Sequence, residues 1–203
     1  MPLAASMVII MMASLVVGAG SIAYFSDIES SNNNTITAGS LDLKVDGGDT
    51  NVVKITIDNW KPSSGPYLYT YEIHNDGTID GYLDLSKVEV IDYENGRVEP
   101  EIEAGDTTGG DPGKDNGELS SLLKMHIFVD NPPANGWFGS EDETIYEGYV
   151  NGVASSYDLN LLIPAGETRH ITIQIGWWLG GNDNLAQTDS VVLNIEFTLS
   201  QAP

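Results

Sequence analysis

The feature that most constrains the fold is an alternation of apolar and polar side chains near the C-terminus. In residues 191–199, every second position carries Val, Leu, Ile or Phe, with mostly polar residues between them. Shorter runs at 41–45, 53–57, 69–74 and 170–175 alternate in the same way. A period of two is typical of antiparallel strands with one buried and one exposed face. The chain is therefore predicted to fold mainly as β-strands.

Turn-forming residues separate these runs. They are Asp46-Gly47-Gly48, Asn75-Asp76-Gly77, Asn95-Gly96 and Pro164-Ala165-Gly166, which favour tight changes of chain direction. About eight antiparallel strands at irregular spacing predict an all-β fold, a jelly-roll β-sandwich. A helical turn is indicated only at residues 118–125.

Two segments interrupt the strand pattern. Residues 94–117 are acidic and rich in glycine, and we expect them to form an exposed loop. Residues 130–143 contain two adjacent prolines and the apolar pair Trp137-Phe138. This pair either forms an exposed contact site or belongs to a loop that folds back over the end of the sandwich.

The N-terminal stretch is apolar. Residues 3–23 carry no charge, and a run of about 20 apolar residues is long enough to span a bilayer. The run ends in small residues, however, and Ser21-Ile22-Ala23 fits a signal-peptidase site. We expect residues 1–23 to be a signal peptide removed between Ala23 and Tyr24. A retained anchor is the alternative, and the lack of Lys or Arg before the apolar run counts against a signal peptide.

Charge and cysteine content limit the partners. The chain has 30 acidic and 8 basic residues, a formal net charge of −22, and none of the charged residues precedes Asp27. Such a surface repels nucleic acid and anionic lipid headgroups, so we expect no nucleic-acid partner and membrane contact only before signal cleavage. The chain has no cysteine, which excludes disulfides, thiol catalysis and cysteine metal sites.

Six segments resemble the TasA/camelysin family of secreted proteins, in the same order across nearly all of the chain after residue 23. They include a turn before a strand in the first half and a closing signature at the C-terminus. The segments are residues 23–27, 33–35 with 37–43, 75–78 with 82–85, 117–120, 163–168, and 184–190 with 197–201.

The resemblance implies a jelly-roll subunit that assembles head to tail with copies of itself into an extracellular filament, as in bacterial biofilm matrix and the bundling pili of some archaea. The resemblance further implies that the segment following the cleaved signal peptide inserts as a donor strand into the neighbouring subunit. Three parts are then expected: 1–23 as signal peptide, 24–38 as donor strand and linker, and 39–203 as the jelly-roll domain. The apolar donor side chains expected to fill pockets are Tyr24, Phe25, Ile28 and Ile36.

Physical reasoning agrees with such a donor. A strand added to an open sheet edge gains main-chain hydrogen bonds of about 1 kcal/mol each. The alternative is that residues 24–34 form a disordered tail or pair within their own domain. The partners expected are therefore further copies of the chain, and a signal peptidase during export.

An enzyme is the first alternative, because camelysin is described as a metallopeptidase. The sequence has no His-Glu-x-x-His motif, although a catalytic zinc normally needs about three protein ligands. The histidines His74, His126 and His170 each lie in a different strand-like run. We therefore expect no catalytic activity and no catalytic residue.

A monomeric adhesin that binds calcium or carbohydrate is the second alternative. Acidic side chains between the predicted strands offer oxygen ligands to Ca²⁺, the residues Asn182-Asp183-Asn184 offer further ones, and Trp177-Trp178 offers a stacking surface for a sugar. Neither acidic group has the EF-hand pattern, so solvated loop charge is the simpler interpretation and we expect no obligatory cofactor. Asn33 begins the one Asn-x-Ser/Thr sequon in the chain, a possible glycosylation site. The calcium candidates in the first group are Asp106, Asp111, Asp115 and Glu118.

Overall fold

The computed structural model describes residues 39–58, 65–108, 113–114, 116–177 and 183–202. All of these belong to the second of two compact units, residues 39–203. The signal segment, the Ala23–Tyr24 cleavage point, the donor residues and Asn33 lie outside the described residues. In the part that is described, no helix is long and apolar enough to cross a membrane.

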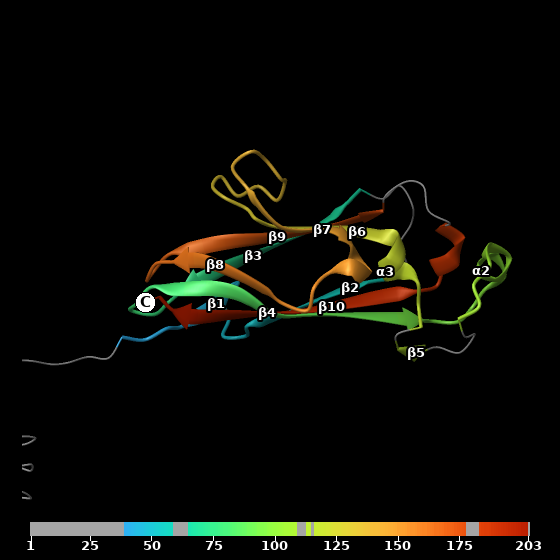
Figure 1. Cartoon of the computed structure of the whole chain (residues 1–203), viewed down its shortest axis with the longest axis horizontal. Helices are drawn as coiled ribbons and strands as arrows, with labels where there is room; N and C mark the ends of the chain where they lie inside the picture. Colours follow the sequence, from blue (N-terminus) through green and yellow to red (C-terminus); the bar gives the residue numbers. More distant parts are fainter. Residues whose placement is uncertain (1–38, 59–64, 109–112, 115, 178–182, 203) are drawn as a thin grey trace, which may run out of the picture. The chain divides into compact units, whose positions relative to one another are not determined.

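Two antiparallel sheets form this unit (Figure 1). We call them sheet A and sheet B. Sheet A has the order β1 (Leu43–Val45), β3 (Tyr67–Asn75), β9 (Thr168–Trp177), β6 (Leu123–Val129) and β7 (Glu143–Tyr149). Sheet B has the order β2 (Val52–Ile57), β10 (Ser190–Gln201), β4 (Gly81–Glu94) and β5 (Gly113–Lys114), and β8 (Tyr157–Ile163) also pairs with β4.

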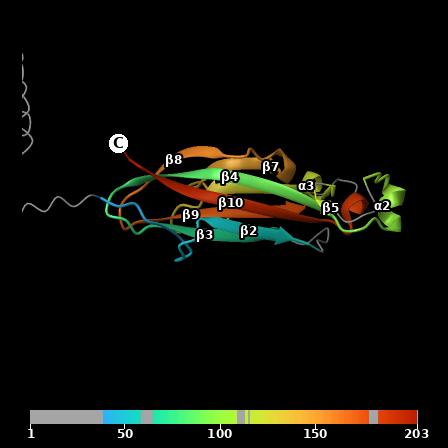
Figure 2. The same ribbon diagram turned by 90° about the horizontal axis from the view of Figure 1, so that it is seen from below.

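The predicted jelly-roll sandwich is confirmed by the strand order. Without the short strands β1 and β5, eight strands remain, four in each sheet, in the orders β2-β10-β4-β8 and β3-β9-β6-β7. Figure 2 shows β2, β10 and β4 side by side. This distribution of sequential strands between two packed sheets is the jelly-roll arrangement.

The alternating runs supply the core between the sheets. In β10, the side chains of Leu193, Ile195 and Phe197 are fully buried, as are those of Ile171 and Ile173 in β9. The intervening residues of each strand face away from the core because successive side chains of a strand point to opposite faces. The sequence-based interpretation of these strands is therefore confirmed.

Two expectations need correction. The helical pattern at 118–125 gives only α3 (Leu119–Leu122), because from Leu123 onward the side chains alternate into the core as strand β6. Residues 94–117 are not simply an exposed loop. They contain α2 (Glu99–Ala104), and three of their acidic side chains are buried, at Glu94, Glu101 and Asp106.

The loop at 130–143 folds back over the outer face of sheet A. The ring of Phe138 lies 4.5 Å from the ring of His126 and 5.3 Å from that of Phe128, between centroids. Phe128 is fully buried, whereas Phe138 and Trp137 remain 46% and 56% exposed. The two interpretations of Trp137-Phe138 therefore each hold in part, because the loop packs on the sheet and still presents both rings to solvent.

Candidate functional site

Four acidic side chains gather at the end of the sandwich that carries α2, opposite the C-terminus (Figure 1). Glu94 is the last residue of β4, Asp106 follows α2, Glu118 precedes α3, and Asp189 precedes β10. Glu94, Asp106 and Asp189 are 0%, 6% and 2% exposed, and Glu118 is half-buried. We call these four residues the carboxylate cluster.

Strand register accounts for half of the carboxylate cluster. β10 pairs antiparallel with β4, and Ser190 lies opposite Tyr93. The next residues in each direction are Asp189 and Glu94, so the sheet itself brings these two carboxylates to the same place.

The α2 segment supplies the third carboxylate. The fully buried Glu101 accepts hydrogen bonds from the backbone N–H of Val98 through Oε2 (2.7 Å) and from that of Thr188 through Oε1 (2.9 Å). These bonds fix the first turn of α2 against the chain leading into β10. Gly105 ends the helix with φ +96°, a left-handed conformation suited to glycine, and Asp106 follows directly.

The fourth carboxylate depends on a close backbone approach at Gly117. A Cβ at this position would lie 2.8 Å from the carbonyl oxygen of Tyr93 and 3.0 Å from Oδ2 of Asp189. Only glycine fits here without displacing the backbone. The approach lets the N–H of Glu118 donate to Asp189 Oδ2 at 2.6 Å.

The cluster is compact. Carboxylate oxygens of Glu94, Asp106 and Glu118 all lie within 4.8 Å of one another. Thr108 bridges two of these residues, because its hydroxyl donates to Asp106 Oδ1 at 2.6 Å and also contacts Glu118 Oε1. The Gly96 N–H donates to Glu94 Oε1 at 2.9 Å.

One oxygen of each carboxylate has no hydrogen-bond donor among the residues that the structure describes. These atoms are Glu94 Oε2, Asp106 Oδ2, Glu118 Oε2 and Asp189 Oδ1, and all four are buried. Buried polar atoms are almost always hydrogen-bonded in folded proteins. Four orphaned acceptors in one place are therefore an unusual feature that needs a physical reason.

Burial and mutual repulsion alter the acidities. Burial raises the pKa of Asp189 to about 7, and the nearby carboxylates of Glu94 and Glu118 add to this effect. Burial also raises the pKa values of Glu94 and Glu118. The pKa of Asp106 is instead lowered, chiefly because the Thr108 hydroxyl donates to its carboxylate. The site thus holds more negative charge than its surroundings stabilise.

The sequence predicted only part of this cluster. The calcium candidates Asp106 and Glu118 do come together, whereas Asp111 and Asp115 lie outside the described residues. Glu94 and Asp189 were missed, because only the pairing of β4 with β10 brings them to this end. In the second calcium candidate, Asn182 and the side chain of Asp183 are also outside the described part of the chain. The same holds for Trp178 and the side chain of Trp177 in the tryptophan pair.

The three histidines lie on sheet A and do not converge. His74 Nδ1 lies 3.0 Å from the Thr168 hydroxyl, and His126 Nε2 lies 2.9 Å from the Thr144 hydroxyl. His170 Nε2 lies 3.8 Å from a carboxylate oxygen of Glu72. Among the described residues, the one group of three or more potential metal ligands is Glu94, Asp106 and Glu118, which contains no histidine. This all-carboxylate set does not fit a catalytic zinc.

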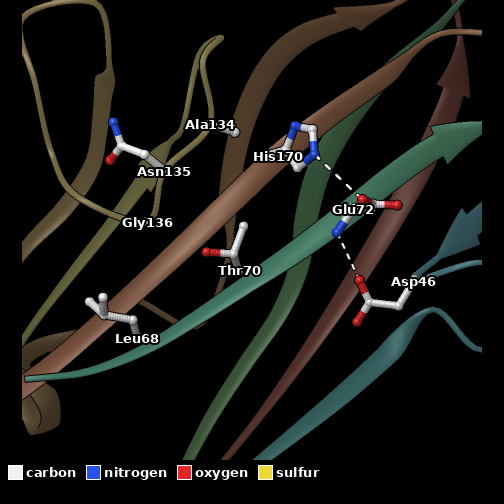
Figure 3. Close-up of a pocket in the computed structure, with 8 residues that line it drawn as sticks. All are labelled: Asp46, Leu68, Thr70, Glu72, Ala134, Asn135, Gly136 and His170. Carbon is white, nitrogen blue, oxygen red and sulfur yellow. Dashed lines mark hydrogen bonds and ion pairs between the residues drawn. The ribbon is translucent and has the colours of Figure 1, made fainter.

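An open pocket of about 690 Å³ lies beside His170 on sheet A (Figure 3). Its polar residues interact with one another. The Glu72 carboxylate contacts His170, and the backbone N–H of Glu72 donates to Asp46 Oδ1 at 2.8 Å. The described lining holds one histidine and two carboxylates, and the hydroxyl of Thr70 pairs with that of Thr172 at 2.8 Å. Its lining residues are Asp46, Leu68, Thr70, Glu72, Ala134, Asn135, Gly136 and His170.

Comparison with known proteins places the chain in a family. None of the curated proteins compared with the chain matches it. The model of the family described as camelysin metallo-endopeptidase matches residues 2–118, more than half of the 203 residues. The match includes Glu94, Asp106 and Glu118 and agrees with the resemblance found in the sequence. The chain therefore belongs to the camelysin family.

Proposed function

We propose that the chain is a secreted structural subunit of an extracellular filament, either pilus-like or a biofilm-matrix fibre. In this proposal, residues 24–36 of one subunit complete the sandwich of the next by donor-strand complementation. The membership of the camelysin family supports a secreted or surface protein. The jelly-roll fold with open sheet edges supports addition of a strand from another subunit.

The observation that carries the proposal is the open side of the sandwich formed by β7 and β8. Within the described residues, β7 pairs only with β6 and β8 only with β4, so the outer edge of each strand is unpaired. A groove of about 400 Å³ runs between them and is lined by half-buried apolar side chains such as Ile145, Leu159 and Leu161. Each edge strand has seven residues, enough to pair with an extended segment of similar length.

A donor strand fits this groove on physical grounds. Pairing with an edge yields about 1 kcal/mol per main-chain hydrogen bond, and Tyr24, Phe25, Ile28 and Ile36 supply apolar side chains for burial. Covering the edge also removes a template for uncontrolled aggregation. Because the donor and the groove are formed by different segments of the chain, the contact is heterologous and propagates into an open filament.

Disulfide crosslinking can test insertion of the donor strand into this groove, because the chain has no native cysteine. We expect that Ile28→Cys and Leu161→Cys, mixed under oxidising conditions, form a disulfide between subunits. The control is Leu199→Cys in the slot on the opposite side of the sandwich, which should not crosslink to position 28. Crosslinking to Leu199→Cys but not to Leu161→Cys would place the acceptor elsewhere, and crosslinking to neither would contradict donor insertion.

Export is the second part of the proposal. A signal peptidase removes residues 1–23, which frees Tyr24 to leave the membrane and enter a neighbour. Ala23→Trp should block cleavage, because signal peptidases require a small residue there, and the precursor should then stay in the membrane fraction. Normal secretion of this variant would contradict the cleavage assignment.

Peptidase activity is the competing function, because the family description names a metallo-endopeptidase. The separation of His74, His126 and His170 favours the structural role. We expect no hydrolysis of a protein substrate by the purified chain. Hydrolysis that is abolished by a chelator and by substitution of these histidines would overturn this expectation.

A further inference from the structure

We propose that the carboxylate cluster binds one divalent cation, Ca²⁺, between Glu94, Asp106, Glu118 and Asp189. The first support is geometric, because oxygens from three of these residues already lie within 4.8 Å of one another. The second and independent support is the set of orphaned acceptors. Glu94 Oε2, Asp106 Oδ2 and Asp189 Oδ1 belong to residues that are at least 94% buried, and no donor from the described part of the chain reaches them.

A bound cation would balance the negative charge of the carboxylate cluster. Burying a carboxylate oxygen without a hydrogen-bond or ionic partner is unfavourable. Among the described side chains, the guanidinium of Arg97 is a nearby positive group, but it donates to the backbone carbonyl of Asp106 at 3.3 Å rather than to a carboxylate. A divalent cation bound between these side chains would give the orphaned oxygens a positive partner.

The chemistry of the ligands selects the cation. All four side chains offer hard oxygen atoms, and the three whose oxygens lie within 4.8 Å of one another include no histidine. Ca²⁺ takes six to eight oxygen ligands and tolerates irregular geometry, whereas Mg²⁺ demands a near-ideal octahedron and Zn²⁺ prefers nitrogen and sulfur. Carboxylates that can bind through one or both oxygens can meet the higher coordination number of Ca²⁺.

Such a cation would fasten four chain segments together. Glu94 ends β4, Asp106 follows α2, Glu118 precedes α3 and Asp189 precedes β10. The ion would therefore replace the missing favourable contacts at this end of the sandwich, in a chain that has no disulfide. This inference is independent of the donor strand, because it concerns the stability of each subunit rather than contact between subunits.

The test measures binding and stability in the purified full-length chain after removal of metal with a chelator. Calorimetric titration with CaCl₂ should show one site, and calcium should raise the melting temperature relative to the chelated protein. Glu94→Gln and Asp106→Asn keep the side-chain volume, and each should weaken calcium binding at least about tenfold. Glu103→Gln is the matched control, because Glu103 is an exposed carboxylate on α2, and its calcium response should equal that of the wild type.

Three results would overturn the proposal. One is the absence of binding heat and of any change in melting temperature at millimolar calcium. Another is an equal loss of calcium response in Glu103→Gln and Glu94→Gln, which would indicate diffuse counter-ion binding by an acidic surface. The third is a preference for MgCl₂ or ZnCl₂ over CaCl₂ in the same titration. A variant that fails to fold is replaced by Glu118→Gln, whose side chain is only half-buried.

Discussion

Two regions of the molecule bury carboxylates, and they differ in how many hydrogen bonds the buried oxygens receive. In the loop over sheet A, Asp130 is 1% exposed and both of its oxygens accept hydrogen bonds. Its donors are the Gly136 N–H at 2.8 Å, the Thr172 hydroxyl at 2.9 Å and the Asn135 N–H at 3.2 Å. At the carboxylate cluster, four buried oxygens receive no hydrogen bond from any described residue.

The contrast separates structural from ligand-directed burial. Asp130 is fully satisfied by the protein and fastens a loop, so no ligand is needed to explain it. Glu101 is similar, since its oxygens accept from Val98 and Thr188. Only where carboxylates face one another without donors does the structure point to a cation. Burial of a carboxylate alone is therefore a poor guide to function. Whether its oxygens have hydrogen-bond donors distinguishes a structural carboxylate from one that binds a ligand.

The largest expected effect concerns the pH dependence of the metal-free protein. Because burial raises the folded-state pKa of Asp189 to about 7, the folded state binds more protons than the unfolded state above pH 4. The free energy of unfolding should therefore fall as pH rises from about 4 to about 7, by roughly 4 kcal/mol in total. Asp189→Asn should remove much of this fall in urea titrations at several pH values. A stability that is flat over this range in the wild type would contradict the description of the cluster.

The second prediction tests the satisfied carboxylate. Asp130→Ala should lower the free energy of unfolding by about 3 kcal/mol, because buried donors from Gly136 and Thr172 lose their acceptor. Asp158→Ala is the control. Asp158 is exposed, so its substitution should change stability by less than about 0.5 kcal/mol. Equal effects of the two substitutions, measured by chemical denaturation, would show that Asp130 does not fasten the loop.

Sequence patterns predicted the sandwich better than the cluster, and the reason is physical. Burial of Leu193 and Phe197 follows from alternation within one strand, which is a local property. The proximity of Glu94 and Asp189 follows from the pairing of two strands about a hundred residues apart. The register of that pairing cannot be read from a single sequence. Asp106 and Glu118 were found because they are close in sequence. The helical turn at 119–122 was placed correctly, but its extension to Met125 was wrong because core packing favoured a strand there.

The third prediction concerns the aromatic contact beneath the loop. Phe138→Ala should destabilise the protein by about 1 kcal/mol, because the ring packs against both His126 and Phe128. Trp137→Ala should have a smaller effect, since Trp137 is 56% exposed. Thermal denaturation of both variants measures the difference. A larger loss in Trp137→Ala would reverse the assignment of which ring fastens the loop.

The smallest expected effect is a pH response of opposite sign at His126, in the strand β6 beneath the same loop. Burial lowers the pKa of His126, and the carboxylate of Glu147 only partly opposes this. A folded-state pKa below the unfolded value means that stability is lost as pH falls below about 6.5. His126→Phe should reduce that loss, in contrast to Asp189→Asn, which acts at rising pH. An unchanged low-pH profile in His126→Phe would contradict the burial effect.

The central claim is that the chain polymerises through its N-terminal segment, and electron microscopy of the secreted protein tests it most directly. The chain processed after Ala23 should form long filaments, while a variant that lacks residues 24–36 should remain a folded monomer. The jelly-roll core of that variant should show an unchanged circular dichroism spectrum. Filaments formed by the deletion variant, or a processed wild-type chain that stays monomeric at millimolar calcium, would contradict the account.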